Sequence, residues 1–360
     1  MALYDRVRGV WVFQGKARSD DVQDVQRPHH GAEATERDRA AGEVSAAPAD
    51  VLGADRNKPK IGALAPWFGA KRTLADKIVR QLGEHRIYWE VFCGSMAVTL
   101  AKAPCVMETV NDLHGDLINL ARVVRSDELA PKLFERMSLS LMHEGVMDEC
   151  AERYRQRGNG PALDEPDLDR ACDFLLMSWL GRNGVAGTSS YNQGFCVRYT
   201  GSGGHAATRF NSVIASIPAW WSRLRNVTIL NRNARELLAK IDDAKGTAIY
   251  LDPPYVEKGA EYIHDFLAGK RKGTSLFTSA ANQPMSHQEL ATLARRFKKA
   301  RVVVSYYDHA LIRELYDGWT FVECPTHKSL VNQGLRMKGR DSNPEKAPEV
   351  LIINGPEYKA

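Results

Sequence analysis

The stretch with the clearest chemical potential is 248–255, where an apolar run ends in Asp252, Pro253, Pro254 and Tyr255. The short, partly β-branched run predicts a buried strand, and two consecutive prolines force the chain to leave the sheet. A carboxylate and an aromatic ring are therefore expected at the carboxyl end of a strand, where open α/β sheets bind ligands. Acceptor groups beside a flat ring suit a planar heterocycle that carries an amino group. An ordinary strand-ending turn is the alternative.

A second group of candidate residues surrounds a glycine turn near the start of the regular pattern. Trp67 and Lys71 bracket Gly69 and precede a helical apolar pattern from Leu74 to Leu82. An aromatic face and an ammonium group beside a tight turn could hold an adenine ring and a carboxylate. A helix entry with a packed tryptophan would give the same pattern.

A β-α-β unit follows this turn. Residues 87–92 predict a strand, Gly94 a tight turn, and the residues from about Ser95 a helix, so backbone N–H groups could face a ligand. A second strand, predicted at 106–110, leads into Asn111 and Asp112. An acid at the end of such a strand can accept both ribose hydroxyls. The unit predicts an adenosine-containing cofactor.

No acidic residue occurs between Phe174 and Arg235, a stretch of 62 residues. Its seven arginines predict a surface for a phosphate backbone, although a solvated region with incidental arginines would look similar. Residues 181–211 form its least regular part, a long loop that carries the side-chain types that reach bases and phosphates. The candidates for DNA contacts are Arg182, Asn183, Tyr191, Asn192 and Arg198.

The elements that position these residues alternate between strands and helices. Helices are predicted at 116–181, including one continuous segment over 128–157 and another over 168–180, and at 214–224, 234–241, 286–299 and 308–316. Further strands are predicted at 227–230, 301–306, 320–324 and 350–353. This alternation predicts a doubly wound, mostly parallel α/β sheet, with the last two strands antiparallel because no helix separates them.

The predicted domain organisation has three parts. Residues 1–59 are expected to be a disordered extension, because they are rich in Ala, Asp, Arg and Gln with little apolar periodicity. Residues 60–130 and 226–356 are expected to form the catalytic domain. Residues 131–225 are expected to be an inserted helical and loop region that recognises the nucleic-acid target.

Composition narrows the class of protein. The chain has 360 residues, of which 44% are apolar and 26% charged, with a net charge of +5. We expect no membrane span and no signal peptide, because no apolar run is long enough and the N-terminus is polar. The six cysteines form no CxxC or Cys/His cluster, which indicates no metal site and fits a reducing cytoplasm, here of a bacterial or phage-infected cell.

Four motifs in order resemble the Dam-type (class alpha) DNA N(6)-adenine methyltransferases, many of which are encoded by phages or prophages. They are Pro66–Lys71, Glu90–Gly94, Asn111–Ile118 and Asp252–Tyr255, and the resemblance covers about residues 64–353. It implies a seven-stranded Rossmann-like sheet of the class I methyltransferases, S-adenosyl-L-methionine as cofactor, and double-stranded DNA as substrate. It also implies a monomer, no metal, and DNA methylation of the restriction–modification type.

The resemblance also implies residue roles. Trp67, Gly69, Lys71, Glu90, Phe92, Gly94, Asp112 and Asp252 would bind the cofactor, and Asp252, Pro253, Pro254 and Tyr255 would be catalytic. Three positions depart from the family pattern. Met96 replaces a second glycine, Val91 a proline, and Asn233 an acid.

The expected reaction transfers a methyl group to the exocyclic amino nitrogen of a flipped-out adenine. Asp252 and the Pro253 carbonyl would accept the amino hydrogens, and Tyr255 would stack on the ring. Other interpretations are amino methylation of cytosine, RNA or protein, and an inactive DNA-binding or regulatory module of the same fold. A nicotinamide-dependent dehydrogenase would share the β-α-β start but lacks a GxGxxG motif and leaves residues 252–255 unexplained.

Overall fold

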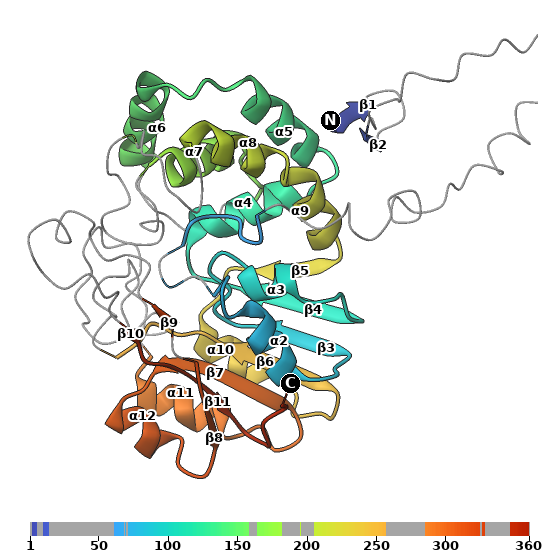
Figure 1. Ribbon diagram of the computed structural model, residues 1–360. Coiled ribbons are helices and arrows are strands. Elements are labelled where there is room, and N and C mark those ends of the chain that lie inside the picture. Colours follow the sequence, from blue (N-terminus) through green and yellow to red (C-terminus); the bar gives the residue numbers. More distant parts are fainter. Residues whose placement is uncertain are drawn as a thin grey trace, which may run out of the picture. The chain divides into compact units, whose positions relative to one another are not determined.

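The computed structural model describes residues 2–5, 10–13, 61–67, 69, 71–157, 164–181, 195, 205–256, 285–324, 326–327 and 346–359. The chain divides into two compact units, residues 1–60 and 61–360. In the first, β1 (Ala2–Asp5) pairs antiparallel with β2 (Val10–Phe13). The second unit carries the predicted α/β fold (Figure 1).

The second unit is built on a seven-stranded sheet with the order β5-β4-β3-β6-β7-β11-β8. Five neighbouring strands are parallel, and β11 runs antiparallel to β7 and to β8. The doubly wound, mostly parallel sheet and its antiparallel end are therefore confirmed. The strands are β3 (Ile87–Glu90), β4 (Met107–Asn111), β5 (Val227–Leu230), β6 (Thr247–Leu251), β7 (Arg301–Tyr307), β8 (Thr320–Glu323) and β11 (Glu349–Ile353). A separate short pair joins β9 (Thr326–His327) to β10 (Lys346–Ala347).

Both faces of the sheet are buried, which explains why the strands read as continuous apolar runs. In β6, Ala248 and Tyr250 belong to a core shared with Ile78 of a helix on one face. Ile249 and Leu251 belong to a core formed with helices on the other face. The first face carries α2 (Ala75–Leu82) and α3 (Ala97–Ala101); the second carries α10 (Ala234–Lys240), α11 (His287–Ala294) and α12 (Ala310–Leu315).

A group of helices gathers beyond the β5 edge of the sheet (Figure 1). They are α4 (Gly115–Arg125), α5 (Leu129–Leu139), α6 (Glu144–Arg157), α7 (Leu168–Leu180), α8 (Ala206–Ile214) and α9 (Ile217–Leu224). Helix α7 has the predicted bounds and is buried on all sides from Arg170 to Leu180, and α4, α5, α6 and α8 pack around it.

Three predicted helices differ from the structure, one of them because α11 ends at Ala294 and not at residue 299. The segment 128–157 forms α5 and α6, separated at Ser140, whose hydroxyl bonds the Arg136 carbonyl as Ser138 bonds Phe134. Such side-chain bonds to the backbone compete with helix continuation. The segment 214–224 is likewise split, because Pro218 starts a new helix, α9, in its first turn.

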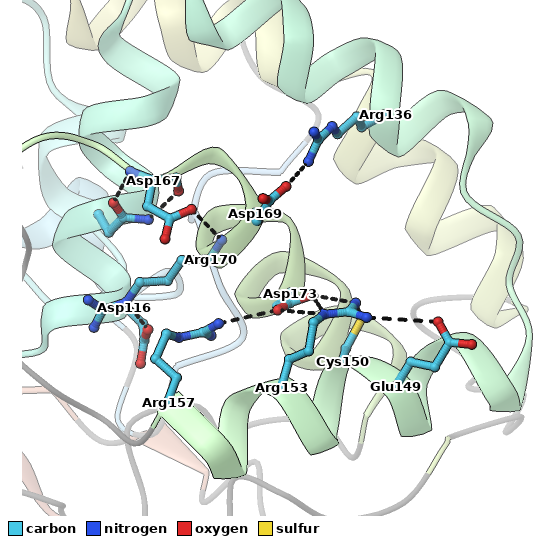
Figure 2. Close-up of polar contacts among 11 residues, drawn as sticks. Asp116, Arg136, Glu149, Cys150, Arg153, Arg157, Asp167, Asp169, Arg170 and Asp173 are labelled. Atoms are coloured by element: carbon cyan, nitrogen blue, oxygen red, sulfur yellow. Dashed lines mark hydrogen bonds and ion pairs between the residues drawn. The ribbon is translucent and has the colours of Figure 1, made fainter.

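Charged side chains connect α7 to its neighbours (Figure 2). Arg170 of α7 donates to Asp116 of α4 at 2.5 Å, and both side chains are at most 2% exposed. Asp173 of α7, also buried, accepts from Arg153 and Arg157 of α6. Because both charges of the Asp116–Arg170 pair are buried, loss of one partner costs far more free energy than loss of an exposed pair.

We expect Asp116→Ala to lower the free energy of unfolding by about 3–5 kcal/mol, because Arg170 loses its buried carboxylate. The double variant Asp116→Ala/Arg170→Met should lose less, since no uncompensated charge is left. Chemical denaturation measures both. Asp169→Ala, which breaks the exposed contact with Arg136, is the control and should cost about 1 kcal/mol or less. A single variant as stable as the double variant would contradict this account.

Candidate active site

The candidate site lies where the chain reverses its direction of travel across the sheet. From β3 the chain proceeds outward to β4 and β5, and then returns to β6 on the other side of β3. Ligands of doubly wound sheets bind beyond the carboxyl ends of the strands at such a switch point. A small cavity that is partly open to solvent lies there. It is lined by Trp67, Lys71, Glu90, Cys93, Gly94, Ser95, Ala97, Val98, Tyr250 and Asp252.

The segment before α2 forms one wall of this cavity. Leu64 is fixed by its own N–H to the Ser95 carbonyl at 3.0 Å and by the Trp179 indole N–H to its carbonyl at 3.1 Å. Trp67 lies against Gly94, where an added Cβ would come within 3.0 Å of the indole nitrogen. The predicted residues Trp67, Lys71 and Gly94 are therefore brought together, and the close approach of the indole explains the glycine.

The turn after β3 has a second unusual position. Met96 adopts a left-handed conformation with φ of 60° at the start of α3, the position where the resembling family has a glycine. A non-glycine residue there costs about 1–2 kcal/mol. The fully buried Met96 side chain offsets this cost through core packing.

Glu90 ends β3 and is 2% exposed. Its Oε2 accepts from the Tyr88 hydroxyl at 2.9 Å, the Thr99 N–H at 3.1 Å and the Thr99 hydroxyl. Burial raises the pKa of Glu90 to about 7, although these hydrogen bonds oppose the shift. Glu90 thus joins β3 to α3 and presents a carboxyl group that can lose its proton near neutral pH.

Asp112 fixes the turn from the neighbouring strand. Its two oxygens accept the N–H groups of Gly94 and His114, each at 2.9 Å. Burial raises the pKa of the carboxyl group, against these backbone hydrogen bonds. A carboxylate offers about four lone-pair directions, so it retains capacity for ribose hydroxyls. Asp112, Gly69 and Phe92 are not among the residues that line the cavity, and their contact with a cofactor stays a prediction.

Asp252 and Lys71 form the charged centre of the site. Lys71 Nζ lies 2.9 Å from Asp252 Oδ1 and 3.4 Å from Glu349 Oε1, and donates to the Gly69 carbonyl at 2.8 Å. The Asp252 side chain is 19% exposed, against 6% for Lys71. Burial raises the pKa of Asp252 to about 6; Lys71 opposes this rise and Glu349 adds to it.

Pro253 is buried and Pro254 is partly exposed, and the chain leaves the sheet at Leu251 as predicted. Tyr255 is 7% exposed. Its ring packs edge-on to Tyr307, with centroids 4.6 Å apart, and its hydroxyl bonds Glu349. Stacking of Tyr255 on a base would therefore require more of the ring to become accessible, and this role stays a prediction.

The predicted DNA contacts Arg182, Asn183, Tyr191, Asn192 and Arg198 lie outside the described residues. Other arginines of the acid-free stretch have carboxylate partners from elsewhere in the chain. Arg223 makes two hydrogen bonds to Glu108, and Arg235 two to Glu289. These two arginines therefore support the fold, which the absence of acids within the stretch could not reveal.

Sequence reasoning missed Glu349 and also overlooked a structural use of Asn233. Glu349 begins an antiparallel strand, so it reaches the carboxyl ends of the parallel strands from the start of β11. Asn233 caps α10 by accepting the Arg235 N–H at 2.9 Å.

The described residues contain neither a metal-type cluster nor a membrane-spanning helix. No cluster of three or more His, Cys, Asp or Glu side chains there has the arrangement of a metal site. No helix in this part of the chain is long and apolar enough to cross a membrane.

Comparison with known proteins gives two matches. Residues 67–330 match the family model described as D12 class N6 adenine-specific DNA methyltransferase. The chain is 23% identical to a DNA adenine methylase of Haemophilus influenzae over 308 residues, which cover 81% of this chain and 93% of that protein. The matched region includes the cavity and the residues around Asp252.

The raised pKa of Glu90 predicts a pH dependence of stability. Burial raises the pKa of Glu90 from its ordinary value to about 7. The contribution of Glu90 to the stability of the fold is therefore complete below the ordinary carboxyl pKa and is lost as the pH rises through about 7. In Glu90→Gln, we therefore expect the thermal midpoint to fall less than in the wild type between about pH 5 and about pH 8. Thermal unfolding across this range tests the prediction, with exposed Glu357→Gln as the control. Equal slopes for wild type and Glu90→Gln would contradict it.

Proposed function

We propose that Asp252 and Pro253 orient the adenine amino group for methyl transfer, because this chain belongs to the D12 class N6 adenine-specific DNA methyltransferases. The chain is a DNA methyltransferase that acts on adenine. The observation that carries the assignment of residues is the position of Asp252 at the switch point, paired with Lys71 and facing the cavity.

The cavity is the proposed site of S-adenosyl-L-methionine, the donor that the family implies. Its lining fits this molecule chemically. The carboxylates of Glu90 and Asp252 suit a sulfonium cation, and the rings of Trp67 and Tyr250 suit an adenosine. Gly94 allows the Trp67 indole to lie against the turn after β3. When bound, the cofactor supplies an activated methyl group.

The protein's contribution is to present acceptors to the amino nitrogen, whose lone pair is delocalised into the adenine ring. Asp252 accepts one amino hydrogen and the Pro253 carbonyl accepts the other, which favours a pyramidal nitrogen with its lone pair directed at the methyl group. Lys71 holds the Asp252 carboxylate in place at 2.9 Å. Much of the acceleration then comes from positioning.

No covalent intermediate with the enzyme is part of this proposal. Cys93 lines the cavity, but burial raises the pKa of its thiol well above the ordinary value. A protonated thiol is a poor nucleophile, so Cys93 is proposed to serve as packing.

The substrate is DNA, and the target adenine must leave the duplex to reach the cavity. We propose that the region between α7 and α8, which includes Arg182, Asn183, Tyr191, Asn192 and Arg198, selects the sequence around it. The finer proposal is a site-specific, monomeric enzyme of the cytoplasm, supported by free cysteines such as Cys150 and Cys172. Methylation-sensitive sequencing of DNA from expressing cells tests site specificity, and light scattering of the purified protein tests the monomer.

Asp252→Ala should lower the methylation rate by about 10²–10⁴-fold, because the amino group loses an acceptor. Binding of duplex DNA should be largely retained. Transfer of a labelled methyl group, followed by nucleoside analysis, measures the rate and separates N6-methyladenine from N4-methylcytosine. Asp317→Asn, at an exposed position in the turn after α12, is the control. Retained activity in Asp252→Ala would sink the assignment, and an inactive wild type would indicate a binding module.

The wild-type rate should fall as the pH drops below about 6, because the pKa of Asp252 is raised to about 6 and only the ionised carboxylate is a full acceptor. The single-turnover rate at saturating DNA and cofactor, measured between about pH 5 and about pH 8, tests this. A rate independent of pH through this range would contradict the role of Asp252.

A further inference from the structure

Glu349 is a buried carboxylate close to the proposed catalytic group, in a segment that carries none of the four motifs. It is the first residue of β11, lies opposite Tyr307 in the register, and is 7% exposed. Because β11 is antiparallel, its first residue lies at the same sheet edge as the last residues of β6 and β7. The antiparallel direction of β11 therefore places residue 349 at the site.

Glu349 shares its partners with Asp252. Its Oε1 accepts a hydrogen bond from the Tyr255 hydroxyl and lies 3.4 Å from Lys71 Nζ. Asp252 Oδ1 lies 2.9 Å from the same Nζ and 3.3 Å from the same hydroxyl. A tyrosine hydroxyl has a single proton, so it cannot donate to both carboxylates. The shorter contact is with Glu349.

The two carboxylates differ in their access to the cavity. Asp252 lines it and is 19% exposed, whereas Glu349 is not among its lining residues. Any effect of Glu349 on the reaction is therefore indirect, through Lys71, through Tyr255 and through its charge beside Asp252.

We propose that Glu349 is a positioning residue for methyl transfer, which holds Lys71 and the Tyr255 hydroxyl so that Asp252 keeps its acceptor capacity for the substrate amino group. This inference rests on the function proposed for Asp252. Without Glu349, the Tyr255 hydroxyl would turn to Asp252, and Lys71 would pair with Asp252 alone. Both changes would occupy the oxygen that the amino group needs.

The charges around Asp252 set its pKa and therefore the pH dependence of the methylation rate. Burial raises the pKa of Asp252 most, Lys71 lowers it, and Glu349 raises it. Removal of the Glu349 charge should therefore lower the pKa of Asp252 and move the acidic limb of the rate to lower pH. Among the described residues, the titratable groups that interact electrostatically with Asp252 are Lys71, Glu90, Tyr250, Tyr255, Tyr306 and Glu349.

The experiment compares Glu349→Ala, Glu349→Gln, Tyr255→Phe and the double variant Glu349→Ala/Tyr255→Phe with the wild type. We expect Glu349→Ala to lower kcat by about 10- to 100-fold, with its acidic limb at lower pH. Glu349→Gln keeps an acceptor oxygen for Tyr255 and removes only the charge. It should lose less activity than Glu349→Ala but show the same direction of shift. In the double variant, the effect of Glu349→Ala should be smaller, since no hydroxyl remains to capture Asp252.

A purely structural role gives a different result: a lower thermal midpoint, an unshifted acidic limb, and equal effects of Glu349→Ala with and without the Tyr255 hydroxyl. That result would overturn the proposal. Glu323→Gln, an exposed acid on the adjacent strand β8, is the matched control and should leave the pH profile unchanged. If Glu349→Ala does not fold, the nearly isosteric Glu349→Gln, alone and combined with Tyr255→Phe, still provides the shift and its dependence on the hydroxyl.

A readout without catalysis separates this inference from the proposed function. The carboxyl titration of Asp252, followed by NMR in carbon-13-labelled wild type and Glu349→Gln, should move to lower pH in the variant. An inactive wild type that shows this shift would overturn the proposed function and support the coupling of Glu349 to Asp252. An active wild type with no shift in Glu349→Gln would overturn only the inference.

Discussion

The buried lysine between two carboxylates is the interaction on which the site depends. Lys71 is 6% exposed and lies within 3.4 Å of both Asp252 and Glu349. Two negative charges and one positive charge in a poorly solvated space are unfavourable unless hydrogen bonds and shared protons compensate. The Tyr255 hydroxyl and the Gly69 carbonyl provide such contacts. The cluster therefore stabilises one relative arrangement of three distant segments, namely the turn before α2, the end of β6 and the start of β11.

The sheet brings these carboxylates together because it combines parallel and antiparallel strands. The parallel strands β3 and β6 deliver Glu90 and Asp252 at their carboxyl ends. The antiparallel β11 delivers Glu349 to the same edge from the opposite direction of travel. Asp112 follows β4 and accepts a hydrogen bond from the turn after β3, so that β3, β4, β6 and β11 each contribute one carboxyl group.

The sequence predicted the parts that depend on local pattern. Apolar periodicity placed α7 and β5 with their observed bounds, and the prolines at 253 and 254 marked the end of β6. It did not predict the break between α5 and α6, since serine hydroxyls compete with a helix only when they bond backbone carbonyls. The sequence also did not predict the ion pairs, because partners such as Arg223 and Glu108 lie 115 positions apart in the chain. Glu349 was missed because strand direction, which decides the edge it reaches, is a property of topology.

The position of β11 in the sheet has a consequence for biosynthesis. β11 lies between β7 and β8, and β8 joins the sheet through β11. Residue 349 follows β3 to β8 in the chain, so a nascent chain cannot complete this cluster before β11 has left the ribosome. Until β11 arrives, the Tyr255 hydroxyl and Lys71 have only Asp252 as a carboxylate partner within this cluster. The last strand of the sheet to be translated therefore completes both the hydrogen-bond ladder and the charge balance of the site.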